Sequence, residues 1–378
     1  MSRQELLEMT RSLVEHGKAD TMELVDDVMA IPASDYTDEE RFEREKNLIF
    51  KRLPLMMAPS CELPEPGCYK AMEVAGIPVL ITRQKDGTAQ AFLNSCTHRG
   101  NPVAEGSGKA TRFTCGYHGW TFKNDGELLA IASTLDPNST LDIESYLCGY
   151  DDVLKHFGFD SWHLFDQRTI SGPNWKTAYD GYLDFYHLPV LHKNTFGADF
   201  FNRANYFSWG PHQRLSSPSK FVQKTGSDEK IDLTELDEKD WPIDALLQGV
   251  WTIFPHISIA SFYGGGGRGA MISQLFPGEK VGESYTTQFY VMEHAPTDDA
   301  VRQGAREQFD FLETVVAEED YKTGKRQHEA LQSGLIDKVY FGRNEGGGQA
   351  FHQWVDRLTN ADDAELQQIF APQLQAAE

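Results

Sequence analysis

The chain has 378 residues, 40% of them hydrophobic, which is enough to build the cores of two globular domains. No run of eighteen apolar residues occurs and the first thirty positions contain seven acidic residues, so the sequence predicts a cytoplasmic protein with no signal region or membrane span. The net charge of −22 argues against nucleic acid and anionic membranes as partners, because clustered Lys and Arg bind phosphates.

The N-terminal part is polar and helix-prone, and a capping box from Thr37 to Glu40 precedes an amphipathic run over residues 41–53. This pattern predicts an N-terminal helical arm over residues 1–55. The pattern then changes to short β-prone runs, such as residues 77–82 and 90–94, which Gly and Asp separate. We therefore expect a small all-β domain within residues 56–150.

Two short motifs lie in this β-prone region, separated by sixteen residues: Cys96 with His98, and Cys115 with His118. Two thiolates and two neutral imidazoles are the ligands of a Rieske [2Fe–2S] cluster, in which each iron is held by one kind of ligand. The same four residue types also bind zinc, but zinc fingers group the cysteines together and the histidines together. Here the types alternate, which favours the cluster and leaves zinc as the alternative.

A second concentration of chemistry lies at residues 174–192. Asn174 is a plausible N-cap, and the following residues read as a helix until Pro189. Asp184 and His187 would then lie one turn apart, and a break at Pro189 would bring His192 towards His187. Two histidines and one carboxylate bind non-haem Fe(II) and leave one side of the metal open, so the third ligand must come from elsewhere in the chain.

After residue 150, aromatic-rich strands are predicted at residues 251–254, 257–263 and 285–291, with helical patterns around them. A long helix is predicted over residues 298–332, and its apolar face carries Phe309, Leu312, Val316, Asp320, Gly324, Gln327 and Leu331. An antiparallel sheet packed by such helices is an α+β domain, here residues 151–378. Glycine runs at residues 264–267 and 346–348 read as turns, because no phosphate-loop Lys follows either run.

Asp320 lies on the predicted apolar face, where a carboxylate is costly unless a metal or a cation compensates its charge. We therefore predict that Asp320 is the third metal ligand. Glu318 and Glu319 are its neighbours, and Glu319 remains an alternative for this role.

Residues 96–100 and 115–120 resemble the Rieske domains of ring-hydroxylating oxygenase alpha subunits, bacterial enzymes that activate dioxygen at a mononuclear iron. The spacing of Asp184, His187 and His192 after an Asn-Trp-Lys helix start is similar to that family's iron motif. Gly116 stands where many members have Pro, which removes no ligand. The resemblance implies an α+β fold with the helical arm, a small all-β Rieske domain and an antiparallel-sheet, helix-grip (START-like) catalytic domain.

The resemblance also implies a role for each motif residue. Asp184 would link His187 to the cluster of a neighbouring subunit, through that subunit's copy of His118. This implies a trimeric ring, of this chain alone or with beta subunits, that receives electrons from a separate reductase or ferredoxin. The implied ligands are Cys96, His98, Cys115 and His118 for the [2Fe–2S] cluster, and His187, His192 and Asp320 for the mononuclear Fe(II).

The function expected is therefore that of a terminal oxygenase, which hydroxylates, cis-dihydroxylates or demethylates an apolar, aromatic or polycyclic small molecule. The sequence contains no dinucleotide-binding fingerprint, so the reductase is expected to be a separate protein. Two alternatives belong to other classes: a Rieske-type electron-transfer protein without oxygenase activity, and a zinc-stabilised binding module. The length of the chain and the second histidine motif oppose the first of these.

Overall fold

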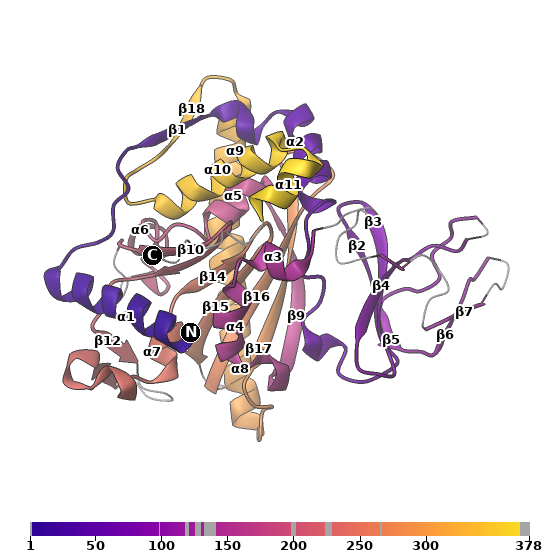
Figure 1. The fold of residues 1–378 in the computed structure, drawn as a ribbon, viewed down its shortest axis with the longest axis horizontal. Coiled ribbons are helices and arrows are strands. Elements are labelled where there is room, and N and C mark those ends of the chain that lie inside the picture. Colours follow the sequence, from indigo (N-terminus) through magenta and orange to yellow (C-terminus); the bar gives the residue numbers. More distant parts are fainter. Residues whose placement is uncertain are drawn as a thin grey trace.

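The computed structural model describes residues 2–97, 99–117, 121–124, 130–131, 141–197, 202–223, 229–264 and 267–370. Its centre is a seven-stranded antiparallel sheet of order β10-β11-β14-β15-β16-β17-β9 (Figure 1). All three strands predicted in this part of the chain belong to it. The strands are β9 (His163–Gly172), β10 (Asn205–Trp209), β11 (His212–Ser216), β14 (Val250–Ile253), β15 (Ile257–Gly264), β16 (Gly267–Pro277) and β17 (Ser284–Met292).

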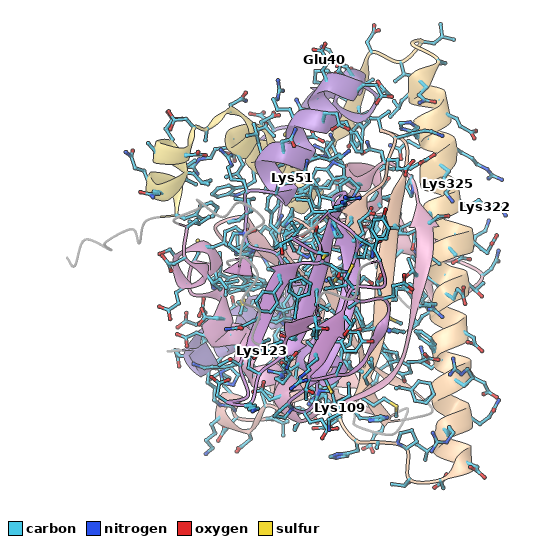
Figure 2. The ribbon with its side chains drawn as sticks, turned by 90° about the vertical axis from the view of Figure 1, so that its right-hand side faces the viewer. Glu40, Lys51, Lys109, Lys123, Lys322 and Lys325 are labelled. Atoms are coloured by element: carbon cyan, nitrogen blue, oxygen red, sulfur yellow. The ribbon has the colours of Figure 1, made fainter. Side chains whose placement is uncertain are left out.

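One face of this sheet is covered by a long helix, which runs along the sheet in Figure 2, where Lys322 and Lys325 are labelled on it. It consists of α8 (Asp299–Glu313), the π-helical segment η9 (Thr314–Tyr321) and α9 (Lys322–Gln332). Arg168 of β9 donates to the Phe309 carbonyl of α8 at 2.7 Å, which ties the helix to the sheet. The opposite face carries apolar residues that pack in one cluster with α1 (Ser2–Ala19), α4 (Tyr150–Leu154) and α7 (Ile243–Leu247).

The long helix predicted from the sequence is present, and Gly324 and Leu331 of its predicted face are buried, but Gln327 is not. A π-helical turn contains more residues than an α-helical turn, so it rotates the remainder of the helix. The residues of α9 that are buried are Gly324, His328 and Leu331, whereas Gln327 is exposed.

The N-terminal arm includes one strand as well as helices. Strand β1 (Met29–Pro32) pairs with β18 (Lys338–Phe341) near the C-terminus. The predicted capping box is wrong by one residue, because Asp38 caps α2 (Glu39–Glu45) by accepting from the Arg41 backbone N–H. A π-helical segment, η2 (Lys46–Phe50), continues α2.

The predicted all-β region forms two sheets beside the central one (Figure 1). The larger has the order β5-β2-β3-β4-β8, and the smaller is the β6–β7 hairpin. Val74 and Val79 of this region share a core with Phe276 and Val281 of the catalytic part, so the two parts pack directly. The strands are β2 (Cys68–Val74), β3 (Ile77–Arg83), β4 (Ala89–Leu93), β5 (Ser107–Lys109), β6 (Arg112–Thr114), β7 (Thr121–Lys123) and β8 (Ala130–Ile131).

The remaining elements are short, apart from α10 (Gly346–Asn360). They are the α-helices α3 (Ile143–Leu147), α5 (Trp175–Asp180), α6 (Leu188–Leu191) and α11 (Asp363–Ile369), the strands β12 (Phe221–Gln223) and β13 (Lys230–Asp232), and the 3-10 turns Ala33–Tyr36, Ser60–Glu62, Lys155–Phe157, Phe159–Ser161, Leu233–Glu235 and Glu238–Asp240. In the part of the chain that the structure describes, no helix combines the length and the apolarity needed to cross a membrane.

The two glycine runs have different structures. Gly264 and Gly267 are paired at the end of the β15–β16 hairpin, as predicted, and residues 265 and 266 lie outside the described residues. The second prediction is wrong, because Gly346, Gly347 and Gly348 form the first turn of α10. A Cβ atom at Gly347 would lie 2.8 Å from the ring of Tyr206, so close packing accounts for the missing side chain.

Candidate metal centres

Helix α5 begins as predicted. The Asn174 side chain accepts from the Lys176 backbone N–H at 2.9 Å, and its amide donates to the carbonyls of Tyr36 and Val281. The Lys176 ammonium binds Glu45 of the N-terminal arm at 2.5 Å, and both side chains are fully buried. The arm therefore fixes the start of the helix that leads to the histidine motif.

The end of α5 differs from the prediction. The helix stops at Asp180, so Pro189 does not end it. Pro189 instead lies in the first turn of α6, where its missing N–H costs nothing. Residues 181–187 form a non-helical loop, and this loop brings His187 and His192 together, with ring centroids 5.1 Å apart.

Asp184 and His187 contact each other through a tight turn of this loop. One carboxylate oxygen of Asp184 accepts from the Tyr186 backbone N–H, and the other lies 3.0 Å from His187 Nδ1. His187 Nε2 is left facing Asp320, with a separation of 3.6 Å from Oδ1. The predicted contact between Asp184 and His187 is therefore present, although the predicted helix is not.

Two neighbouring carboxylates of the π-helical segment reach opposite sides of the His192 ring. Asp320 Oδ1 lies 3.1 Å from Nε2, and Glu319 Oε2 lies 2.7 Å from Nδ1. Glu319 also accepts from the Thr195 hydroxyl at 3.0 Å. Burial lowers the pKa of His192, but hydrogen bonds and charge from Asp320 and Glu319 outweigh it and raise that pKa above the usual value.

The ligand atoms of His187, His192 and Asp320 lie within 4.8 Å of one another, the one such group among the residues that the structure describes. Ligands that share an ion at about 2.1 Å lie roughly 3 to 3.5 Å apart, which is close to the separations found here. Both Nδ1 atoms face a carboxylate, the usual second partner of a metal-bound imidazole. The residues present therefore fit a mononuclear ion, with Asp320 as the ligand and Glu319 behind His192.

Three further contacts around this site were not predicted from the sequence. Glu319 was weighed only as a ligand, because its position behind His192 depends on the π-helical turn. Asp180 accepts from the Tyr36 hydroxyl at 2.6 Å and lies 3.0 Å from His352 Nε2. Tyr36 and His352 come from opposite ends of the chain, so no local pattern connects them with Asp180.

The two cysteines of the first motif pair are buried together. Cys96 and Cys115 pack in one cluster with Leu80 and Phe113. Asn101 bridges their loops, because its carbonyl accepts from the Cys96 backbone N–H at 2.8 Å and its amide lies 3.7 Å from Cys115 Sγ. The predicted ligands His98 and His118 lie outside the described residues.

A cavity of about 240 Å³ adjoins the histidine site. Asp184, His187 and Asp320 line one side of it, and Tyr340 and Phe341 of β18 line another. Two exposed aromatic side chains belong to this region: Tyr340, which lines the cavity, and Tyr186, which precedes His187 in the chain.

Comparison with known families agrees with both parts of the chain. Residues 54–143 match the family described as Rieske [2Fe-2S] domain, and residues 159–361 match the one described as ring hydroxylating alpha subunit (catalytic domain). The second match covers more than half of the 378 residues. The chain therefore belongs to the Rieske non-haem iron oxygenases, a family of oxidoreductases whose cofactors are a [2Fe–2S] cluster and a mononuclear iron.

Two similar proteins illustrate the range of this family. The carnitine monooxygenase oxygenase subunit of Acinetobacter baumannii is 30% identical over 249 residues, which are 57% of this chain and 64% of that protein. The alignment thus spans less than two thirds of that relative. Toluate 1,2-dioxygenase subunit alpha of Pseudomonas putida is 36% identical over 132 residues, 34% of this chain and 28% of that subunit.

Solved structures agree with the fold. A quaternary ammonium Rieske monooxygenase aligns with a TM-score of 0.70 at 20% identity and covers 88% of this chain and 95% of its own. Naphthalene 1,2-dioxygenase from Rhodococcus sp. aligns with a TM-score of 0.70 at 17% identity, over 96% of this chain and 100% of its own. At these identities the likeness concerns the fold alone, and it confirms the predicted α+β class.

Proposed function

We propose that this protein is the terminal oxygenase component of a Rieske non-haem iron system. It receives electrons singly from a separate reductase or ferredoxin and uses dioxygen to oxidise a small organic molecule. The observation that carries the proposal is the convergence of His187, His192 and Asp320 in a chain that also has a Rieske domain. An electron-transfer protein needs no such second site, so this geometry favours an oxygenase over the electron-transfer alternative.

The residues of the second site have distinct roles in this proposal. Bound iron(II) supplies open coordination positions at which dioxygen and substrate meet. His187, His192 and Asp320 hold it from one side. Asp184 and Glu319 accept from the Nδ1–H groups of the two histidines, which keeps each Nε2 free of a proton and directed towards Asp320.

The cluster is held in this proposal by Cys96, His98, Cys115 and His118. The Asn101 amide is directed at Cys115 Sγ, and hydrogen bonds to ligand sulfurs are among the factors that set the reduction potential of such clusters. The same residue fixes the backbone at Cys96, so it holds the two ligand loops in register.

Electron transfer between two copies of the chain accounts for the positions of the two sites. In Figure 1 the strands β2 to β7 lie on one side of the central sheet, whereas α6, which directly follows His187, lies on the other. Asp184 lines the cavity together with His187 and the exposed Tyr340, and Tyr117 of the second cluster loop is also exposed. We propose that this loop of one subunit docks at Asp184 of the next subunit in a trimeric ring.

The substrate proposed from the sequence was apolar and aromatic or polycyclic. That expectation came from the family resemblance, and the relatives do not single it out, since they include proteins named for carnitine as well as for toluate and biphenyl. We propose a small organic substrate that is hydroxylated, dihydroxylated or demethylated. Buried polar side chains on the catalytic sheet bear on the chemical class of this substrate.

Two measurements on one anaerobic preparation test the proposed function. Metal analysis should give about three irons for each chain, two in the cluster and one at the histidine site. The reduced protein should then show reoxidation of the cluster absorbance that accelerates with dioxygen and substrate together. Zinc in place of iron would refute the proposal, and so would a full iron complement with no substrate-dependent reoxidation across a broad panel of acids, amines and arenes.

A further inference from the structure

A row of polar side chains crosses the sheet face beneath the long helix. The antiparallel register places one polar residue of each strand beside the next, and the five in the middle of the row are almost completely buried. Buried polar groups in the middle of a sheet are unfavourable unless they find partners. From β9 to β10 the row consists of Arg168, Gln288, Ser273, Ser258, Thr252, Gln213 and Ser208.

The row lies next to the metal site. Thr286 is two residues from Gln288 on the same face of β17, about 7 Å along the strand. Its hydroxyl lies 2.6 Å from that of Tyr321, the residue that follows Asp320. The Tyr321 hydroxyl is 3.1 Å from that of Tyr182, which belongs to the loop of Asp184 and His187. Gln288 is therefore two residues along β17 from Thr286, whose hydroxyl contacts Tyr321 beside the candidate ligand Asp320.

Two side-chain N–H donors of this region have no acceptor among the residues that the structure describes. The Arg168 Nε–H donates to Gln288 Oε1 at 2.8 Å, which fixes the orientation of the amide and leaves Gln288 Nε2 as a free donor. Gln288 Nε2 and Arg168 Nη2 are both buried without a partner among the described residues. Gln288 is 0% exposed, so solvent does not satisfy its amide.

The positive charge beside these donors is that of the Arg168 guanidinium. Arg168 Nη1 donates to the Phe309 carbonyl and lies 3.4 Å from Glu313, whose side chain is 49% exposed. Asp310 and Asp166 also act on Arg168 electrostatically, and Asp166 is shared with Arg306 at 2.6 Å. The guanidinium also lies 3.8 Å from the ring centroid of Phe309, which holds it in place.

A carboxylate suits two neighbouring N–H donors of which one is charged, because each of its oxygens can accept a hydrogen bond. We propose that Arg168 Nη2 and Gln288 Nε2 recognise a carboxylate of the substrate, and that this oxygenase acts on an organic acid. The inference rests on the proposed function, since it names the substrate class of the same site. It also replaces the expectation of an apolar substrate.

Ligand binding tests this inference without reference to turnover. The iron-loaded protein is titrated with matched acids and amides: benzoate and benzamide, phenylacetate and phenylacetamide, hexanoate and hexanamide. The rise in melting temperature with ligand concentration gives each apparent Kd. At least one acid should bind about tenfold more tightly than its amide, the effect of a charged hydrogen-bond pair. If every amide binds as well as its acid, the inference is overturned.

Variants locate the binding. Gln288→Glu places a carboxylate beside Arg168 in nearly the same volume, so it should occupy the site and weaken acid binding about tenfold or more. Arg168→Met should do the same by removing the charge. Gln167→Glu adds an equal charge at the neighbouring exposed position and should leave acid binding unchanged. Acid binding that survives both Gln288→Glu and Arg168→Met would overturn the inference, because the acid would then bind elsewhere.

The oxygenase function and the carboxylate site can be refuted independently of each other. Iron content and cluster reoxidation are measured on the same samples, and a lack of either contradicts the oxygenase function whatever the acids do. A protein that holds three irons and reoxidises with a substrate, but shows no preference for acids, retains the function and loses the carboxylate site.

Discussion

Asp320 and Glu319 are adjacent acidic residues with different geometric relations to His192. Asp320 lies beside His192 Nε2, the ring nitrogen that can share a metal ion with His187. Glu319 lies beside His192 Nδ1, on the other side of the ring, and so does not belong to the group of possible ligands. Asp320→Ala should therefore abolish iron binding at the histidine site. Glu319→Gln should weaken it about 10 to 100-fold, as expected for a partner behind a ligand, and keep the site able to fill at high iron concentration.

Equilibrium titration of the metal-free protein with Fe(II), followed by iron analysis after gel filtration, distinguishes these residues. The cluster spectrum serves as the control, since neither residue lies near Cys96 or Cys115 in the fold. Loss of iron in Glu319→Gln together with its retention in Asp320→Ala would reverse the assignment.

In the proposed function, Asp184 connects the two metal sites without binding either metal. Its carboxylate orients His187 from Nδ1, and the same side chain lines the cavity at which a neighbouring cluster loop is proposed to dock. Asp184→Ala should keep both metals yet lower substrate-dependent cluster reoxidation by at least about 100-fold, since it breaks the link and weakens the orientation. Normal reoxidation in a variant with full iron content would show that electrons take another route.

The sequence motif identified residues that do lie together, but the backbone structure predicted for the motif was wrong. The spacing of Asp184, His187 and His192 was sufficient to predict that the three side chains lie together, because two histidines and a carboxylate so close in sequence can reach one point in many backbone conformations. The predicted backbone was a helix that Pro189 breaks, whereas in the structure the helix ends at Asp180 and a loop that starts at Gly181 brings the side chains together. Propensity alone does not show that Glu45, 131 positions from Lys176, fixes where α5 begins.

At the level of elements, the π-helical segment η9 is the feature that positions both carboxylates. It lies between two regular helices, and its register lets Glu319 and Asp320 reach opposite sides of one imidazole. Deletion of Ala317 should restore an α-helical register, which closes the wide turn from which Glu319 and Asp320 project. We expect this deletion to abolish iron binding at the histidine site while the cluster and the sheet remain intact.

Iron analysis and near-ultraviolet circular dichroism of the deletion variant test this, with Ala317→Ser as a control of unchanged length. A deletion variant that binds iron normally would mean that the helix adjusts elsewhere. The sequence predicted this helix but not its irregular turn, because hydrophobic spacing at 3.6 residues describes both halves equally well. The effect of the π-helical turn on burial is seen at residues 327 and 328, where His328 is buried and Gln327 is exposed.

At the level of the whole molecule, two buried histidines make stability depend on pH. Burial lowers the pKa of His212 and of His256 to about 4 in each case, while the unfolded chain has the ordinary value near 6.5. Between these values the unfolded state binds more protons, so stability is present above pH 6.5 and falls as the pH decreases towards 4. Each histidine contributes about 1.4 kcal/mol per pH unit to this slope.

Urea unfolding of the metal-loaded protein at pH 7.5, 6.0 and 5.0 measures the slope. His256→Gln keeps a donor for the Met56 carbonyl, to which His256 Nε2 lies at 3.1 Å, and should remove about half of the slope above pH 5. A midpoint that does not change between pH 7.5 and 5.0 would contradict the prediction.

The separation of the two metal sites within one chain leads to a test of assembly. Cys96→Ser should remove the cluster and leave the histidine site, whereas His187→Ala should remove the mononuclear iron and leave the cluster. Each variant alone should be inactive. If each cluster serves the iron of the next subunit in a closed ring, any mixed trimer contains one junction at which an intact cluster faces an intact iron site.

Random mixing of equal amounts gives three quarters of mixed trimers, each with one working junction of three, so activity should return to about a quarter of the wild-type value. Co-expression of the two variants, followed by substrate-dependent oxygen consumption, measures this recovery, with separately purified variants mixed without subunit exchange as the control. If electrons stayed within one subunit, no mixture would recover, because every chain would lack one of its two sites. Recovery near a quarter therefore requires electron transfer across the subunit boundary. In the proposed route it also requires Asp184 of the chain that holds iron, so replacing the Cys96→Ser partner by a variant that combines Cys96→Ser with Asp184→Ala should eliminate the recovery.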